Sequence, residues 1–204
     1  MPAAPRIGIE MLGGSRLAEA LSEVARLRIE VFRAWPYLYD GTLDYEQRYL
    51  AEFAAANDAL IVVARDGARI VGAATAAPLD GHTSEFVPLF VAAGLDPARI
   101  FYCGESVLLP AYRGHGIGHA FFDRREAHAI SCRSPQGRYT HIAFCAVTRA
   151  PDDPRAPAGY RPLDAFWRKR GYAPVDGLVG SYSWREIGDS EETEKPMQFW
   201  MKPL

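Results

Sequence analysis

Residues 105–118 read ESVLLPAYRGHGIG, an apolar segment that ends at Pro110 and runs into three glycines. The pattern predicts a strand, a sharp turn and the start of a helix. Glycine lets the backbone turn tightly and approach a ligand with its amide groups exposed. Those amides add to the unpaired N–H groups and positive dipole end of the following helix. The stretch therefore predicts an anion site that suits a pyrophosphate; the alternative is a glycine-rich turn that binds nothing.

Two common nucleotide-binding patterns do not match this turn. The pattern GxxxxGK[ST] requires a lysine followed by Ser or Thr, and no such pair follows the glycines. The dinucleotide pattern GxGxxG, begun at Gly114, would require a glycine at position 119, where the chain has His119. The turn therefore belongs to neither class.

Hydrophobic patterning around this turn predicts a mixed α/β domain with one sheet and helices packed on it. Asp66-Gly67, between two apolar runs, is the strongest short signal for a hairpin. Residues 79–99 are expected to form an insertion, with a short helix over 86–93, and residues 149–162 a proline-rich loop. We expect further helices at 15–35, 45–56, 117–130 and 163–171, and strands at 7–11, 59–65, 69–76, 100–109, 140–147, 179–185 and 197–201, with an acidic turn at 189–194.

Composition excludes several classes of protein. The 204 residues are 49% hydrophobic and 24% charged, as in ordinary globular proteins, and we expect a single domain over residues 1–204. A net charge of −2 argues against nonspecific nucleic-acid binding. No apolar run reaches the ~18 residues of a membrane span, and residues 1–6 lack the apolar core of a signal peptide. We therefore expect a cytoplasmic protein with no membrane or nucleic-acid partner.

Neither the cysteines nor the histidines are grouped as a metal site requires. Cys103, Cys132 and Cys145 have no CxxC spacing and are expected to be reduced, mostly buried thiols. The five histidines are scattered, so the sequence predicts no metal.

The glycine-rich turn resembles the acetyl-coenzyme A motif of the Gcn5-related N-acetyltransferase (GNAT) superfamily, Arg/Gln-x-x-Gly-x-Gly/Ala after a strand. Arg113, Gly116 and Gly118 meet that pattern. Residues 165–172, AFWRKRGY, resemble the family's second signature, an aromatic helix that ends in glycine and an aromatic residue. The resemblance implies a predominantly antiparallel central sheet flanked by helices, and acetyl-CoA as cosubstrate.

The resemblance also implies where coenzyme A would bind. Backbone groups of Leu108 and Leu109 would pair with the pantetheine arm, and the amides of residues 113–118, with His119, would hold the pyrophosphate. Basic side chains at 161–170 would favour the phosphates; the alternative is that they are solvated helix charges. The implied coenzyme A-binding residues are Val107, Leu108, Leu109, Arg113, Gly114, His115, Gly116, Ile117, Gly118, His119, Trp167 and Arg168.

The catalytic group is expected on the central strand. In this family a main-chain amide, here Leu108, meets the thioester oxygen, and a strand carboxylate accepts the amine proton. Glu105 is the carboxylate of that strand, and the alternative for it is an ion pair with an arginine. The family often has a tyrosine on the last helix as the acid for the thiolate, but alignment places Trp167 there. Indole cannot supply that proton, which leaves Tyr160, Tyr172 or solvent.

The resemblance also implies that the acceptor amine binds between the first two helices, whose connection is WPYLYDG at 35–41. Carboxylates outnumber basic residues between 37 and 58, and aromatic rings beside carboxylates suit a cationic amine. The alternative is a solvated acidic helix with an aromatic core edge. The predicted acceptor-binding residues are Tyr37, Tyr39, Asp40 and Trp184.

Together these features predict an acetyl-CoA-dependent N-acetyltransferase that acts by direct transfer to a primary amine of a small molecule or peptide. A transfer through an acyl-cysteine is less favoured, because no His lies directly beside Cys103 or Cys145 in sequence. The alternative from another class is a non-catalytic domain of the same fold that binds CoA or a partner. The sequence is compatible with either a monomer or a homodimer.

Overall fold

The computed structural model of the chain describes residues 7–13 and 15–204, so the expectation drawn from residues 1–6 lies outside the described residues. Its strands are β1 (Ile7–Leu12), β2 (Leu60–Asp66), β3 (Arg69–Pro78), β4 (Ile100–Tyr102), β5 (Ser106–Leu108), β6 (His141–Val147), β7 (Ala173–Arg185) and β8 (Glu192–Pro203). Its α-helices are α1 (Ser15–Phe32), α2 (Leu43–Ala55), α3 (Leu79–His82), α4 (Val87–Ala92), α5 (Ile117–Ser131) and α6 (Asp164–Lys169). Short 3-10 turns are η1 (Ser84–Phe86), η2 (Pro97–Arg99) and η3 (Pro110–Tyr112).

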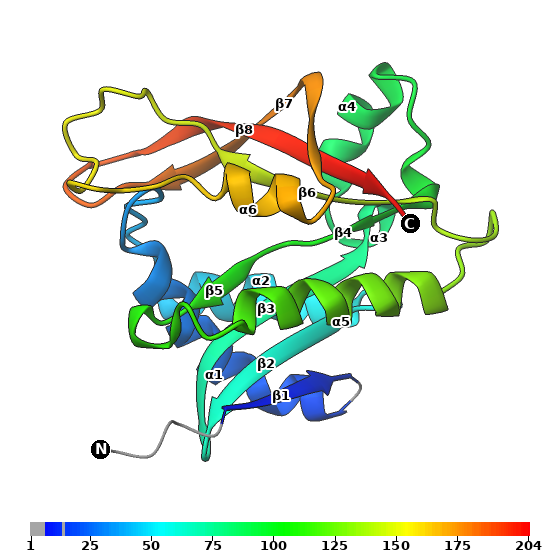
Figure 1. The fold of residues 1–204 in the computed structure, drawn as a ribbon, viewed down its shortest axis with the longest axis horizontal. Coiled ribbons are helices and arrows are strands. Elements are labelled where there is room, and N and C mark those ends of the chain that lie inside the picture. Colours follow the sequence, from blue (N-terminus) through cyan, green and yellow to red (C-terminus); the bar gives the residue numbers. More distant parts are fainter. Residues whose placement is uncertain (1–6, 14) are drawn as a thin grey trace.

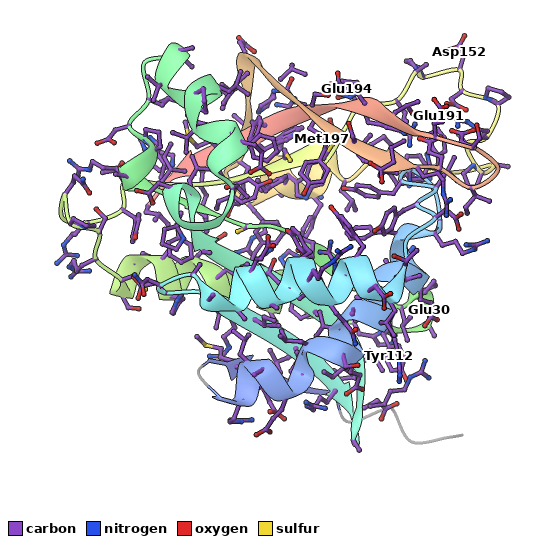
Figure 2. All side chains as sticks on the ribbon, turned by 180° about the vertical axis from the view of Figure 1, so that it is seen from behind. Glu30, Tyr112, Asp152, Glu191, Glu194 and Met197 are labelled. Carbon is purple, nitrogen blue, oxygen red and sulfur yellow. The ribbon has the colours of Figure 1, made fainter. Side chains whose placement is uncertain are left out.

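Within the described chain, eight strands form one sheet in the order β1-β2-β3-β4-β6-β8-β7, and β5 pairs with β3 beside that path. Only the β4–β6 pair is parallel; the other pairs of these strands are antiparallel. Helices α1 and α2 lie on one side of the sheet and α5 on the other (Figure 1), and Figure 2 shows the α1–α2 side from behind. The expected mixed, mostly antiparallel α/β architecture is confirmed.

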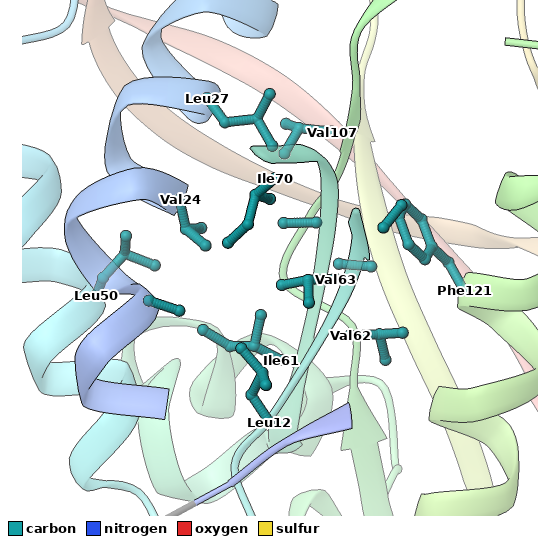
Figure 3. Packing of buried hydrophobic residues seen from close by; sticks show 14 of the residues in the cluster. Leu12, Val24, Leu27, Leu50, Ile61, Val62, Val63, Ile70, Val107 and Phe121 are labelled. Carbon is teal, nitrogen blue, oxygen red and sulfur yellow. The ribbon is translucent and has the colours of Figure 1, made fainter. Parts of the chain in front are cut away.

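The β2–β3 hairpin forms the centre of the main core. Gly67, at its turn, has a φ of 59°, a conformation that glycine adopts without strain. Strand β2 is apolar without alternation because both of its faces are covered. In Figure 3, Val24 of α1 packs from one side and Phe121 of α5 from the other, with Val62 on the Phe121 side. The core thereby fixes the start of α5 relative to the sheet.

The strand expected over 100–109 is interrupted, so the prediction of one continuous strand is wrong. β4 ends at Tyr102 and β5 begins at Ser106. A side chain at Gly104 would lie 2.7 Å from Thr75 Oγ1, which explains the glycine. The buried Arg125 of α5 donates Nη1–H to the carbonyls of Thr75 (3.3 Å) and Glu105 (3.1 Å). These contacts hold the chain in an irregular turn at 103–105.

The interruption separates two strands that would otherwise be neighbours. β4 pairs with β6 as far as Tyr102 and Ala143, and the Cys103 amide still donates to Ala143 O at 2.8 Å. Beyond that point β5 continues with β3, whereas β6 continues with β8. β5 and β6 therefore diverge immediately after the break, with Glu105 at the start of the divergence.

The remaining boundaries differ from the sequence prediction mainly in length. The insertion at 79–99 contains α3, η1, α4 and η2, in place of one helix over 86–93. β7 and β8 extend beyond their predicted ranges and meet in a turn at 186–191, earlier than the acidic turn predicted at 189–194. Among the described residues, no helix has both the length and the apolar character needed to cross a membrane.

Candidate active site

The glycine-rich turn forms an open cradle at the start of α5. Gly114 and Gly116 have φ angles of 80° and 79°, and a side chain at either would meet no atom within 4 Å. Gly116 caps α5, and the first helical bond runs from the Ala120 amide to Gly116 O at 3.1 Å. The amides of the first turn therefore have no acceptor within the helix. The cradle fits the anion site that the sequence predicts.

The side chains of the turn are placed around this cradle in different ways. Arg113 and His115 are exposed, and Arg113 Nε–H donates to Leu108 O at 3.4 Å. Ile117 is buried in the main core and anchors the helix. A side chain at Gly118 would lie 3.6 Å from the Phe166 ring, which packs edge-on against His119 with ring centres 4.9 Å apart. Helix α6 thus borders the cradle.

The exposed edge of β5 is defined by its hydrogen bonds to β3. The Leu109 amide donates to Val71 O at 3.0 Å, and Thr75 donates to Glu105 O at 3.1 Å. Because backbone groups alternate along a strand, those of Ser106 and Leu108 point away from β3, into the divergence. Leu109 O already accepts from Tyr112 at 3.0 Å. The expectation that Leu109 offers free backbone groups is thereby corrected, and Val107 likewise faces β3.

Helix α6 places its two predicted coenzyme A residues against the aromatic core. Trp167 packs on Phe144 and Trp200, with ring centres 5.0 and 5.1 Å away. The Arg168 guanidinium lies 5.1 Å from the centre of the Trp200 ring. Arg170 is bound to two acids of α5, Asp123 at 2.7 Å and Glu126 at 3.1 Å. For Arg170, the interpretation as a charge paired within the protein fits better than phosphate binding.

The tyrosines considered as acids for the thiolate lie elsewhere. The buried Tyr172 donates its hydroxyl to Glu126 Oε1 at 3.1 Å. Tyr160 lies in the loop before α6 and packs edge-on against Trp35, with ring centres 6.1 Å apart. Neither tyrosine lines the cavity that adjoins the break between β4 and β5.

A cavity of about 470 Å³ adjoins the break between β4 and β5. It brings together every predicted acceptor residue and the predicted base: Tyr37, Tyr39, Asp40, Glu105 and Trp184. Gly104 and Cys145 line the end where β5 and β6 diverge. Met197 of β8, labelled in Figure 2, lies on its boundary. The cavity therefore lies at the beginning of β5, and the predicted pyrophosphate cradle lies beyond its end.

The floor of the cavity is a buried charge cluster. Arg28 of α1 forms ion pairs with Glu46 of α2 and with Glu105. All three residues are buried, with 8, 0 and 7% of their surfaces exposed. The ion pair weighed as the alternative for Glu105 is thus present, and it lies inside the cavity.

Sequence reasoning missed Arg28 and Glu46, although a signal was available. Arg28 follows Val24 by four residues and so lies on the apolar stripe of α1. Glu46 stands four residues before Leu50 and seven before Phe53, on the apolar face of α2. Opposite charges on the apolar faces of consecutive helices indicate a buried pair.

Burial sets the protonation of the cavity wall. It raises the pKa values of Tyr37, Tyr49, Tyr102 and Tyr182, so these phenols stay protonated at neutral pH. Burial also raises the pKa of Cys145 to about 12. The wall therefore offers neutral hydroxyls and an unreactive thiol.

The connection between α1 and α2 is tied across the cavity to the end of β7. Asp40 donates its amide to Arg185 O at 2.9 Å, and Ile187 donates to Leu38 O at 2.8 Å. Trp184 Nε1–H donates to Tyr37 O at 2.9 Å. We call residues 36–40 the strap. It fixes Tyr37, Tyr39 and Asp40 over the cavity.

Glu186 supports the strap through Arg149, which bonds to both. It accepts from Arg149 Nη2 and from Arg155 Nη1, each at 2.6 Å, and Arg149 Nε–H also donates to Pro36 O at 2.7 Å. Burial alone would raise the pKa of Glu186, but the hydrogen bonds from these two arginines outweigh it and hold the pKa below its usual range. A lowered folded pKa stabilises the protein above the unfolded pKa of about 4.3, and that stability is lost as pH falls through the folded pKa.

Glu186→Gln should therefore lower the free energy of unfolding by about 3 kcal/mol at pH 7, because two arginines lose their buried partner. Denaturant titrations at pH 7 and pH 3 measure the effect, and the difference from the unaltered protein should shrink at pH 3. Glu191→Gln, at an exposed position of the same turn, is the control. Equal losses for the two variants would show that Glu186 does not hold the strap.

Among the described residues, no three His, Cys, Asp or Glu side chains are grouped to hold a metal ion. No curated protein matches the sequence.

Comparison with solved structures finds the same fold. A candidate acetyltransferase from Acinetobacter baylyi ADP1 is similar over 100% of this chain and 95% of its own, with 11% identity and a TM-score of 0.63. A ribosomal-protein-alanine N-acetyltransferase from Brucella melitensis matches over 96% and 99%, with 12% identity and a TM-score of 0.58. The Salmonella typhimurium protein yncA, a candidate acetyltransferase solved with acetyl-CoA, matches over 96% and 94%, with 10% identity and a TM-score of 0.56.

The sequence also matches a family model. The model of the acetyltransferase (GNAT) family covers residues 24–172, which include the β2–β3 hairpin, the glycine cradle and the aromatic helix. This match spans well over half of the chain. The chain belongs to the acetyltransferase (GNAT) family.

Proposed function

We propose that this chain transfers the acetyl group of acetyl-CoA directly to a primary amine of a small molecule or peptide. One observation carries the proposal. Glu105 lies at the break between β4 and β5, where the cavity floor meets the divergence of β5 and β6. An amine in the cavity and a thioester along β5 would meet beside this carboxylate.

The residues present fit acetyl-CoA. The backbone groups of Ser106 and the N–H of Leu108 point away from β3 on the edge of β5 and suit the amide groups of the pantetheine arm, whereas Leu108 O already accepts from Arg113 Nε–H. The amides of residues 114–119 suit the pyrophosphate, because the space a side chain would fill at Gly114 and Gly116 is open. The Leu108 N–H would donate to the thioester oxygen as negative charge develops there.

Glu105 would act as the base. An acceptor bound as an ammonium gives one proton to the Glu105 carboxylate, and the neutral amine then attacks the thioester carbon. A carbon–nitrogen bond forms and the carbon–sulfur bond breaks. The attacking nitrogen loses its second proton, which passes through water to the departing thiolate, and Glu105 returns its own proton to solvent. A thiol has an ordinary pKa near 8.5, so it leaves as a thiolate without a dedicated acid. This is consistent with a tryptophan at position 167.

The test is thiol release from acetyl-CoA across a panel of amines. We expect release that requires an amine, saturates with both substrates, and yields one free thiol per acetylated amine. Tight CoA binding with no amine-dependent release would contradict the proposal and favour the non-catalytic CoA-binding alternative.

Cys103→Ala should leave kcat within about twofold, because direct transfer uses no protein thiol. Burial raises the pKa of Cys103, which keeps the thiol protonated and poorly nucleophilic. The loss of a buried side chain should lower the free energy of unfolding by about 1 kcal/mol. Steady-state kinetics and denaturant titration measure both effects. A folded variant with kcat reduced a hundredfold would point to an acyl-cysteine route.

A further inference from the structure

The strap closes one side of the cavity. The strap is bonded to β7 and the following turn through Asp40, Leu38 and Tyr37, and to Arg149 through Pro36. A chain could cross this side only if these hydrogen bonds broke. The site therefore has the form of a pocket for a small molecule, within the ~300–1,000 Å³ range of such pockets.

Aromatic side chains form much of the wall of this pocket. They come from six parts of the chain: α1, the strap, α2, the insertion, β4 and β7. Tyr37 and Trp184 lie with ring centres 5.8 Å apart, and Phe86 lies 6.1 Å from both Tyr102 and Tyr182. Such a wall favours an apolar, flat body and also attracts a cation to the ring faces.

The floor carries more negative than positive charge. One guanidinium, Arg28, faces two carboxylates, Glu46 and Glu105. Glu105 Oε1 and Glu46 Oε1 are buried and accept no hydrogen bond from the described residues, whereas Glu105 Oε2 is held by the Arg28 guanidinium. Buried carboxylate oxygens without donors are costly. A ligand that brings one positive charge and several N–H donors would balance the floor.

From the strap, the wall and the floor together we infer that the acceptor is a compact primary amine on an aromatic body, bound as its ammonium ion above Glu46 and Glu105. This inference rests on the proposed function and narrows it, since it excludes polypeptide acceptors. Glu46 becomes a specificity-determining residue. It contacts Arg28 Nε, whereas Glu105 contacts Arg28 Nη1, and it supplies the second negative charge.

Calorimetric titration of CoA-saturated protein tests the acceptor class without turnover. The probes are 2-phenylethylamine, its neutral counterpart 2-phenylethanol, the polar amine ethanolamine, and an unblocked tetrapeptide. We expect one molecule of 2-phenylethylamine per chain, at least tenfold weaker binding of the alcohol and of ethanolamine, and none of the peptide. Equal affinity for the alcohol, or peptide binding that 2-phenylethylamine displaces, would overturn the inference.

Glu46→Gln tests the floor. This variant should bind 2-phenylethylamine at least tenfold more weakly and bind 2-phenylethanol with unchanged affinity. Glu52→Gln, at an exposed position of the same helix, should change neither affinity. A folded Glu46→Gln variant with unchanged amine affinity would overturn the role of Glu46. If this variant does not fold, the affinities of the unaltered protein for 2-phenylethylamine and 2-phenylethanol still test whether the floor binds an ammonium ion.

The same samples, given acetyl-CoA, separate this inference from the proposed function. Binding of 2-phenylethylamine without thiol release would contradict the proposed function and leave the pocket assignment intact. Thiol release with the tetrapeptide and none with 2-phenylethylamine would keep acetyl transfer and overturn the acceptor class.

Discussion

Glu105→Gln should lower kcat by about 10²–10⁴-fold at neutral pH, the usual contribution of a general base. CoA affinity should stay nearly unchanged, because the glycine cradle does not contact Glu105. The defect should shrink as pH rises, since the amine is then deprotonated in solution. A pH profile of kcat for the variant and the unaltered protein measures this.

The fold should tolerate Glu105→Gln, because Arg28 keeps Glu46 as its partner and the floor becomes neutral. Glu52→Gln is again the matched control. Full activity of a folded Glu105→Gln variant would make Glu105 a structural partner of Arg28 and place the base elsewhere. A variant that unfolds would likewise favour the structural role.

Gly116→Val should abolish acetyl-CoA binding. The added side chain would point into the open space of the cradle, where phosphate oxygens belong, and no protein atom would stop it. Valine at a φ of 79° is also strained, at a cost of about 1–2 kcal/mol. Calorimetry with CoA measures affinity, and thermal melting measures stability.

Gly94→Val separates strain from the loss of the site. Gly94 has a φ of 74°, its side-chain position is equally open, and it lies after α4, away from the cradle. This control should lose similar stability and keep CoA affinity. Unchanged CoA affinity in a folded Gly116→Val variant would show that the cradle does not bind CoA.

The sequence allowed the fold to be predicted because its strongest signals are local. The Asp66-Gly67 hairpin and the glycines before α5 report on backbone conformation, which neighbouring residues determine. The break at 103–105 could not be predicted in the same way. It depends on Thr75 and Arg125, which reach it from β3 and α5 and are distant in sequence.

The candidate site was predictable in part for the same reason. Tyr37, Tyr39, Asp40 and Trp184 were expected near the acceptor, and all line the cavity with Glu105. The shared ion pair was not foreseen, because it joins three separate elements. The ring of Trp167 packs against Phe144 and Trp200 and is half-buried, and its contact with coenzyme A stays a prediction.

Direct transfer from acetyl-CoA to an amine is tested most directly by a single turnover with ¹³C-labelled acetyl-CoA, with the protein in excess and 2-phenylethylamine present. Mass spectrometry of the quenched mixture locates the label. Direct transfer predicts that the labelled acetyl group appears on the amine nitrogen, with an equal amount of free CoA and no labelled protein at any time. A labelled protein that passes its acetyl group to the amine, or free CoA formed with labelled acetate and no acetylated amine, would contradict it.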